Sequence, residues 1–243
     1  DMVRNFKEST VNALSRLFDK LAPENLIYKI DKLEVDLGQI APEDFEKELI
    51  SQIEKLLQTQ LIKHPEINSK ALKAISKEQG IFQQFLYFLK KGHFSWNANG
   101  ISLAQMEREL PAIFAGITNE QRKELRLALR ANSSLERLKA QFSKKYHSNL
   151  AAALLPFNDY KVWEKIFAKV LPKPLHSSIS FQAISVYVHY PKISEPQFIA
   201  KWFAVLTMRS RLIDKEVEAL QRKLLNEAKT ALPKVALKLA EAF

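Results

Sequence analysis

The chain has 243 residues, 47% of them hydrophobic, with five glycines and with Leu, Ala, Lys, Gln and Glu recurring at helical spacing. This composition predicts a mainly α-helical fold that is long enough to bury a core. Cysteine is absent, which excludes disulfides, thiolate-bound zinc, iron–sulfur clusters and a cysteine nucleophile.

The net charge of +10 belongs to the later two thirds of the chain. Residues 1–80 carry 12 Lys and Arg against 14 Asp and Glu, whereas residues 81–243 carry 25 against 13. A solvated, lysine-rich surface explains this excess most simply, and the alternative is a surface for nucleic acid or an acidic protein. No apolar stretch is long enough to predict a membrane span, and the charged first twenty residues are unlike a signal peptide. Because the first residues already have a helical pattern, we expect the chain to be a piece of a longer protein.

The first half of the chain predicts three helices. Apolar steps of three and four residues indicate a helix over 3–22, and Pro42 with acidic residues after it starts a helix that runs to about residue 64. A polar link with at most one short helix follows. Residues 81–92 then predict a short, very apolar helix that ends in two lysines and a C-cap glycine.

One segment near the N-terminus has the pattern of a strand. Over residues 26–37, the apolar residues Leu33, Val35 and Leu37 alternate with acidic ones, and Gly38 supplies a turn. A single strand is not stable, so it needs a partner from this chain or from another subunit.

The second half predicts further helices. Three residue pairs have capping-box spacing: Ser102 with Gln105, Thr118 with Gln121, and Ser133 with Glu136. They start helices near 103–110, which Pro111 ends or kinks, near 119–131 and near 134–155. Asp159 starts another helix, and a long one covers residues 195–232.

Residues 180–190 fit either a strand or a helix. Their β-branched residues and their alternation favour a strand, which would pair with the strand at 26–37. The predicted fold is therefore mainly α, a multi-helix domain with a minor β component. Prolines near 172–178 mark the best boundary, which separates a helical domain at 1–171 from a C-terminal region at 172–243; that region can equally belong to the same domain.

No spacing supports a catalytic or metal centre, so we expect an assembly protein without a cofactor instead of an enzyme. The chain has neither a GxSxG elbow nor a glycine-rich phosphate loop. A hydrolase whose residues meet only in the fold is kept as an alternative. The five histidines lack the mutual spacing of metal ligands: His64, His93, His147, His176 and His189.

The basic helices are candidates for a nucleic-acid surface. Glu120, Glu124 and Glu136 lie among their cations at helical spacing, and we expect them to form local ion pairs that weaken the field. Aromatic residues do not interleave as a stacking platform requires, so nucleic acid is the less favoured partner. The cations in question are Arg122, Lys123, Arg126, Arg130, Arg137, Lys139, Lys144 and Lys145.

Two segments resemble the tape measure protein family of contractile injection systems, which are phage-tail-like particles. The family pattern I-x-x-L-E-I-D-L-G-x-I is similar to residues 30–40, and F-L-x-x-G-x-x-P-W is similar to residues 88–96, where Ser95 replaces the more frequent proline. Residues 133–146 resemble the basic helix that follows in the family. The resemblance covers about residues 10–150. The matching residues are Leu33, Glu34, Asp36, Leu37, Gly38 and Ile40, then Phe88, Leu89, Gly92 and Trp96.

This resemblance implies a structural protein at the inner tube of a contractile particle, which sets or starts tube assembly at the baseplate or cap end. It implies tube, baseplate-hub or cap subunits as partners, several copies in a homo-oligomer, assembly in the cytoplasm and release with the particle. The glycines Gly38 and Gly92 would be turn residues. The core or docking residues would be Leu33, Asp36, Leu37, Phe88, Leu89 and Trp96.

Overall fold

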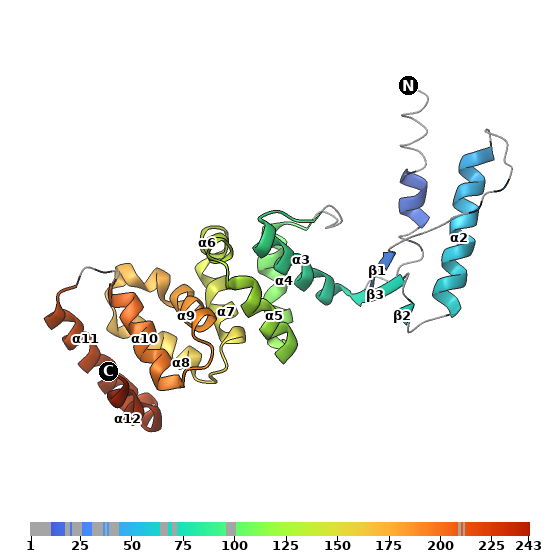
Figure 1. The fold of residues 1–243 in the computed structure, drawn as a ribbon. Coiled ribbons are helices and arrows are strands. Elements are labelled where there is room, and N and C mark those ends of the chain that lie inside the picture. Colours follow the sequence, from blue (N-terminus) through green and yellow to red (C-terminus); the bar gives the residue numbers. More distant parts are fainter. Residues whose placement is uncertain are drawn as a thin grey trace. The chain divides into compact units, whose positions relative to one another are not determined.

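The computed structural model describes residues 11–17, 20, 26–30, 36, 38, 44–63, 68–69, 72–95, 101–208, 210 and 212–243, and the structural statements below concern these residues. They are mainly helical, as the composition predicts (Figure 1). The chain divides into two compact units, Asp1–Gly80 and Ile81–Phe243, and each is described by itself. The proline-containing segment 172–178 lies inside the second unit.

The first unit combines helices with a small antiparallel sheet. A helical stretch at residues 11–17 precedes the strand β1, and α2 precedes β2 and β3. The sheet order is β1-β3-β2, with Leu26 opposite Ser76 and Ile30 opposite Leu72. The bounds are β1 (Leu26–Ile30), α2 (Phe45–Lys63), β2 (Asn68–Ser69) and β3 (Leu72–Ser76).

The predicted strand is confirmed over Leu26–Ile30, but its predicted partner is wrong. The partner is β3, which lies in the segment that was expected to be a polar link. Residues 180–190 instead belong to helix α9 (Ile179–His189). Eight of its eleven residues are buried, so all its faces are apolar and the helical period is lost from the sequence. The alternating residues Leu33 and Leu37 lie outside the described residues.

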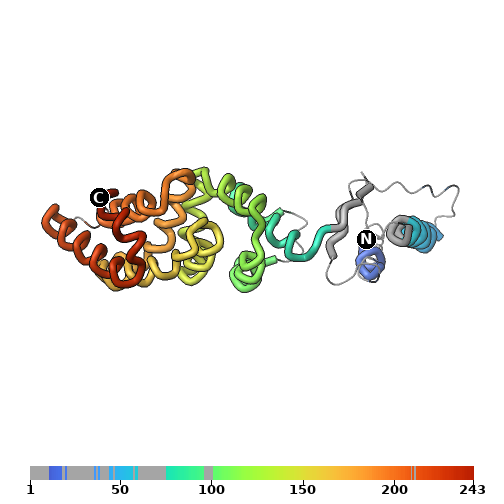
Figure 2. Tube along the Cα trace, turned by 90° about the horizontal axis from the view of Figure 1, so that it is seen from below, coloured from blue at the N-terminus to red at the C-terminus, as the bar shows by residue number. Residues whose placement is uncertain are grey.

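The second unit begins within helix α3 and is built of helices that pack on one core. Figure 2 shows them from a second direction; among the C-terminal helices, α12 contacts both α10 and α11. The bounds are α3 (Lys77–Lys91), α4 (Leu103–Ala115), α5 (Asn119–Leu129), α6 (Asn132–Gln141), α7 (Lys144–Leu154), α8 (Tyr160–Val170), η2 (Lys173–Ser178), α9, α10 (Glu195–Met208), α11 (Asp214–Ala231) and α12 (Pro233–Ala242).

Two helices that were predicted as continuous are each interrupted. The helix expected over 134–155 is α6 followed by α7, because Ser143 is extended and its side chain caps the Tyr146 amide at 3.2 Å. The helix expected over 195–232 is α10 followed by α11. In both cases the two helices face the same core, so the apolar spacing continues across the break and does not reveal it.

The capping predictions have mixed outcomes. Thr118 and Gln121 form the complete reciprocal box, with hydrogen bonds of 3.2 and 2.9 Å. Ser102 accepts the Gln105 amide at 3.2 Å. The box at Ser133 is wrong, because the helix begins two residues earlier than predicted, at Asn132, and its N-cap Ala131 has no side-chain cap. The helix α4 continues through Pro111 to Ala115.

Aromatic residues fill the core of the second unit. Trp163 and Trp202 are fully buried, and the Trp202 ring lies 4.2 Å from Phe167, centroid to centroid. Each indole N–H has an acceptor: Trp163 donates to Glu195 at 3.1 Å, and Trp202 donates to the Ile179 carbonyl at 2.9 Å. In the described part of the chain, no helix is both long and apolar enough to cross a membrane.

Candidate functional site

The second motif forms the end of α3 and the loop after it. Phe88 is 3% exposed and Leu89 is fully buried, so both belong to the core of the second unit. The Gly92 amide donates to the Phe88 carbonyl at 2.8 Å and closes the last turn. Gly92 has a φ of +83°, a conformation that other residues rarely adopt, and the predicted C-cap glycine is confirmed.

Helix α6 satisfies the carbonyl groups at this helix end. The Ser134 hydroxyl donates to the Leu89 carbonyl at 2.8 Å. The Arg137 guanidinium donates to the carbonyls of Leu89 and Lys90 at 2.5 and 3.0 Å. A cation suits this position because the C-terminus of a helix carries partial negative charge. The segments 88–96 and 133–146 of the family resemblance therefore meet; we call this contact the motif junction and define it by Leu89, Gly92, Ser134 and Arg137.

Gly92 is required at the motif junction for a second reason. A Cβ atom at this position would lie 2.9 Å from Arg137 Nε, closer than packed atoms approach. Any other residue would force the Arg137 side chain, whose guanidinium binds the two carbonyls, to shift away from the added atom.

The loop after Gly92 is fastened to α3 by Ser95 and Phe94. The Ser95 hydroxyl donates to the Gln84 side-chain oxygen at 2.8 Å, and the Ser95 amide donates to the same oxygen at 3.4 Å. Proline, which is more frequent here in the family, has no amide hydrogen for this second contact. Phe94 stacks on Phe88 at 5.0 Å, so it is packed on the core. Trp96 lies outside the described residues.

Two buried titratable groups are associated with an aromatic cluster of the second unit: Tyr146, which belongs to the cluster, and His147, the next residue in the chain. The rings of Phe142 and Tyr146 stack at 4.6 Å, and Phe85 contacts both. Burial, and then the charge of Glu107, raises the pKa of Tyr146 well above its ordinary value. Burial lowers the pKa of His147, against the opposing effects of its hydrogen bond to the Leu138 carbonyl and of Glu107. Both groups are therefore neutral near pH 7, where neither carries charge for chemistry.

The residues of the first motif lie in the other compact unit. Asp36 and Gly38 are exposed, and the Asp36 carboxylate accepts the Gly38 amide at 3.0 Å. Gly38 has a φ of +60°, in the left-handed region that favours glycine. Leu33, Leu37 and Ile40 are outside the described residues.

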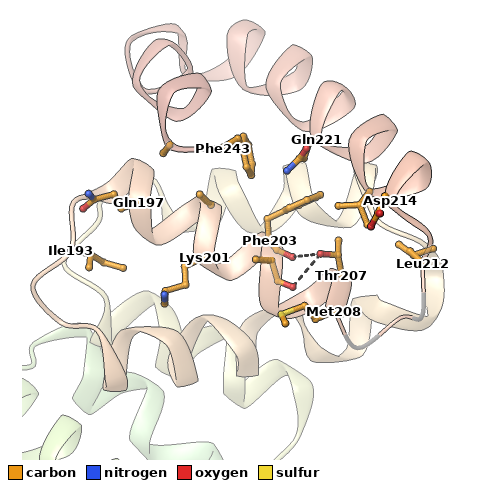
Figure 3. A pocket seen from close by; sticks show the side chains of 14 residues that line it. Ile193, Gln197, Lys201, Phe203, Thr207, Met208, Leu212, Asp214, Gln221 and Phe243 are labelled. Carbon is orange, nitrogen blue, oxygen red and sulfur yellow. Dashed lines mark hydrogen bonds between the residues drawn. The ribbon is translucent and has the colours of Figure 1, made fainter.

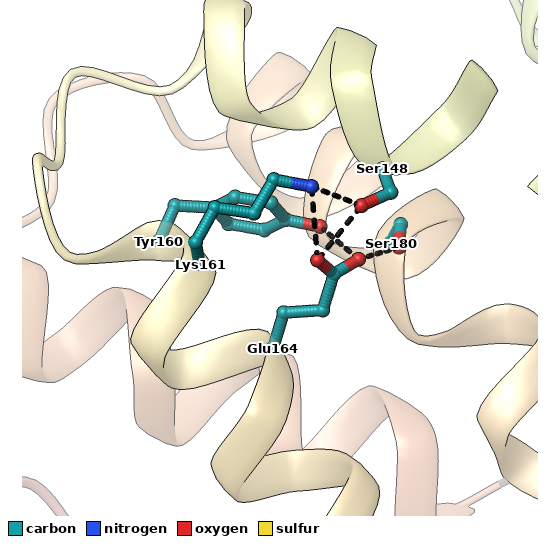
Figure 4. Close-up of polar contacts among 5 residues, drawn as sticks. All are labelled: Ser148, Tyr160, Lys161, Glu164 and Ser180. Carbon is teal, nitrogen blue, oxygen red and sulfur yellow. Dashed lines mark hydrogen bonds and ion pairs between the residues drawn. The ribbon is translucent and has the colours of Figure 1, made fainter. Parts of the chain in front are cut away.

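A polar cluster that the sequence did not predict joins α7, α8 and α9 (Figure 4). The Glu164 carboxylate accepts hydrogen bonds from Ser148 at 2.7 Å, Ser180 at 2.5 Å and Tyr160 at 3.1 Å. Lys161 contacts the Ser148 hydroxyl and forms an ion pair with Glu164 at 3.1 Å. Tyr160, Lys161 and Glu164 lie on α8, whereas Ser148 comes from α7 and Ser180 from α9, so only the fold brings the two serines to the carboxylate.

The hydrogen bonds of this cluster hold α7, α8 and α9 together. Burial raises the pKa of Glu164, but the hydrogen bonds from Ser148, Ser180 and Lys161 outweigh it and lower the pKa overall. Glu164 is therefore ionised at neutral pH, and its carboxylate holds the Ser148 hydroxyl of α7 and the Ser180 hydroxyl of α9 to α8.

The described histidines are held separately by backbone carbonyls. His93, His147, His176 and His189 contact the carbonyls of Phe94, Leu138, Leu171 and Ser185 at 2.7 to 2.9 Å. Among the described residues, no three acidic or histidine side chains gather as a metal site would require.

Two of the basic residues proposed for nucleic acid have structural contacts instead. Arg137 belongs to the motif junction, and Arg122 donates to the Ala153 carbonyl and to Asn119, both at 2.9 Å. The expected local ion pairs are wrong: within the described residues, Glu120, Glu124 and Glu136 form none. The other cations of these helices are thus not neutralised by direct ion pairs.

The polar contacts above connect helices of the second unit to one another. A family model described as "contractile injection system tape measure protein" matches residues 1–241. The chain therefore belongs to the tape measure protein family of contractile injection systems, and the match continues beyond residues 10–150 through the C-terminal helices. No curated protein and no solved structure matches the chain.

Proposed function

We propose that this chain acts at an end of the inner tube of a contractile particle, where it helps to start tube assembly, and that it is not an enzyme. Its partners are tube, baseplate-hub or cap subunits, which it meets in the cytoplasm during assembly before release with the particle. The observation that carries the proposal is the family match over residues 1–241.

The packing of the second unit supports a role at an end over a role as the ruler itself. As one straight helix, residues 81–243 would be about 240 Å long. Folded compactly, a unit of this size has a radius of gyration of about 15 Å. The observed helices α4 to α12 are short and return to a common core, so this part of the chain is poorly suited to span a long tube.

The test is an in-frame deletion of this chain in a system that produces the particle, with tubes counted and measured by electron microscopy. A role in starting assembly predicts few tubes, and irregular lengths among those that remain. A ruler role predicts normal numbers of uniformly shorter tubes. Tubes unchanged in both number and length would refute both.

A point variant isolates the motif junction. Arg137→Ala should reduce the number of tubes because it loosens the end of α3, whereas Gly116→Ala should not, since nothing lies within 4 Å of the added methyl group. Normal tube numbers with Arg137→Ala would show that the junction is not needed for the proposed function.

A further inference from the structure

A groove of about 740 Å³ lies between α10 and the pair of helices α11 and α12 (Figure 3). Phe203, Met208 and Phe243 supply much of its apolar lining. A second hollow of about 370 Å³ shares Gln197 and Ala242 with the groove and so continues it. Along α10, the lining runs from Gln197 to Met208, which is about 16 Å of helix.

Large apolar side chains are exposed in and beside this groove. Met208 is 83% exposed, Ile213 is 64% exposed and Phe243 is 41% exposed. A single exposed apolar residue is ordinary, but two in the lining of one hollow, with Ile213 beside the lining residues Leu212 and Asp214, favour an interaction surface. The face thus offers both a hollow and projecting side chains that could fill a similar hollow.

The groove differs in charge from the rest of its unit. Residues 81–243 carry 25 cations against 13 anions, whereas the described lining of the two hollows has Lys201 and Lys238 against Asp214 and Glu241. Figure 3 shows Lys201 toward the end formed by Ile193 and Gln197, and Asp214 beside Leu212 at the other end. Lys201 lies over the Tyr190 ring at 4.1 Å and, within the described residues, forms no ion pair.

We infer that this groove is a two-fold interface with a second copy of the chain. A two-fold axis across the middle of the groove exchanges its ends, so Lys201 of each copy faces Asp214 of the other. A hollow and apolar projections on one face are what such a self-complementary interface requires. The balanced charge also matters, because two strongly basic units repel each other everywhere except at a face that carries both signs.

This interface would provide the self-association that the proposed function implies. It rests on that function, but it can be tested on the purified chain, without the particle. The mass of the full chain, after nuclease treatment, is measured by light scattering over concentrations on the order of 1 to 100 µM, where small interfaces dissociate. Lys201→Glu and Asp214→Lys each place like charges across the axis, and each should weaken dimerisation at least about tenfold. An equal mixture of the two variants restores both opposite-charge pairs and should dimerise again.

The apolar part of the surface has its own variant and control. Met208→Glu should abolish dimerisation, and because the residue is largely exposed, it should leave the circular dichroism spectrum unchanged. The matched control is Leu127→Glu on α5, another exposed apolar residue that does not line the groove, and it should dimerise normally.

Three results would overturn the inference: a wild-type chain that stays monomeric throughout this range, dimerisation that none of the groove variants alters, or variants that remain monomeric when mixed. None of them bears on tube assembly, so this inference and the proposed function fail independently.

Discussion

Replacement of Gly92 by alanine should destabilise the second unit by about 2–5 kcal/mol. A left-handed conformation costs an ordinary residue about 1–2 kcal/mol. The new Cβ would also lie 2.9 Å from Arg137 Nε and displace the guanidinium from the carbonyls of Leu89 and Lys90. Each lost hydrogen bond costs about 0.5–1.5 kcal/mol at this partly exposed site.

Urea unfolding of the full chain, followed by circular dichroism, measures this loss. Gly116→Ala is the control, because Gly116 has a φ of −110° and open space around it, and it should change the free energy of unfolding by less than about 0.5 kcal/mol. In the double variant Gly92→Ala/Arg137→Ala, the clash is gone, so the combined loss should fall short of the sum by roughly 1 kcal/mol. If Gly92→Ala is as stable as the wild type, or if the two losses simply add, the motif junction does not work as described.

Three further predictions concern buried polar groups. Gln182 is 1% exposed, and its amide has no hydrogen-bond partner among the described residues. Gln182→Met should therefore raise the free energy of unfolding, measured in urea, by about 1–3 kcal/mol. A lower free energy of unfolding in this variant would show that the amide does have a partner. The pKa of Glu164 is lowered from its ordinary 4.5, so ionised Glu164 stabilises the fold above pH 4.5, and this stabilisation disappears as the pH falls through the folded-state pKa. The difference in the free energy of unfolding between wild type and Glu164→Gln should therefore become smaller as the pH is lowered through this range. A difference that does not depend on pH would contradict this. Burial lowers the pKa of His147 from 6.5, because it favours the neutral ring. The free energy of unfolding of the wild type should therefore decrease as the pH falls below 6.5. In His147→Gln, unfolding curves measured at a series of pH values should show a smaller decrease.

The sequence predicts helices well where they have one buried face and a local start signal. Thr118 and Gln121 form their box because both partners of the motif are within one turn. The helix α9 was missed because burial on all sides removes the period that distinguishes a helix from a strand. The pairing of β1 with β3 was also missed, since more than 40 residues separate the strands and pairing depends on tertiary contacts that no local pattern records.

The candidate site was predictable only in part. The glycine at the end of α3 follows from local chemistry, and its conformation is as expected. Its dependence on Ser134 and Arg137, which are more than 40 residues away, required the fold. The same limit applies to Glu164, whose partners Ser148 and Ser180 each lie 16 residues from it in opposite directions.

The motif junction also restricts where this protein can bind its partners. Phe88 and Leu89 are buried, and Gly92 and Arg137 are occupied with ending α3, so the described part of the second motif supports a structural role instead of a docking role. A partner has to contact side chains that are accessible and not already paired. In the described part of the second unit, the cations of α5 to α7 that lack ion pairs and the charge-balanced groove beside α10 are two surfaces that meet this condition. The cations suit an acidic partner and the groove suits a second copy of the chain, so the two surfaces can be occupied at the same time.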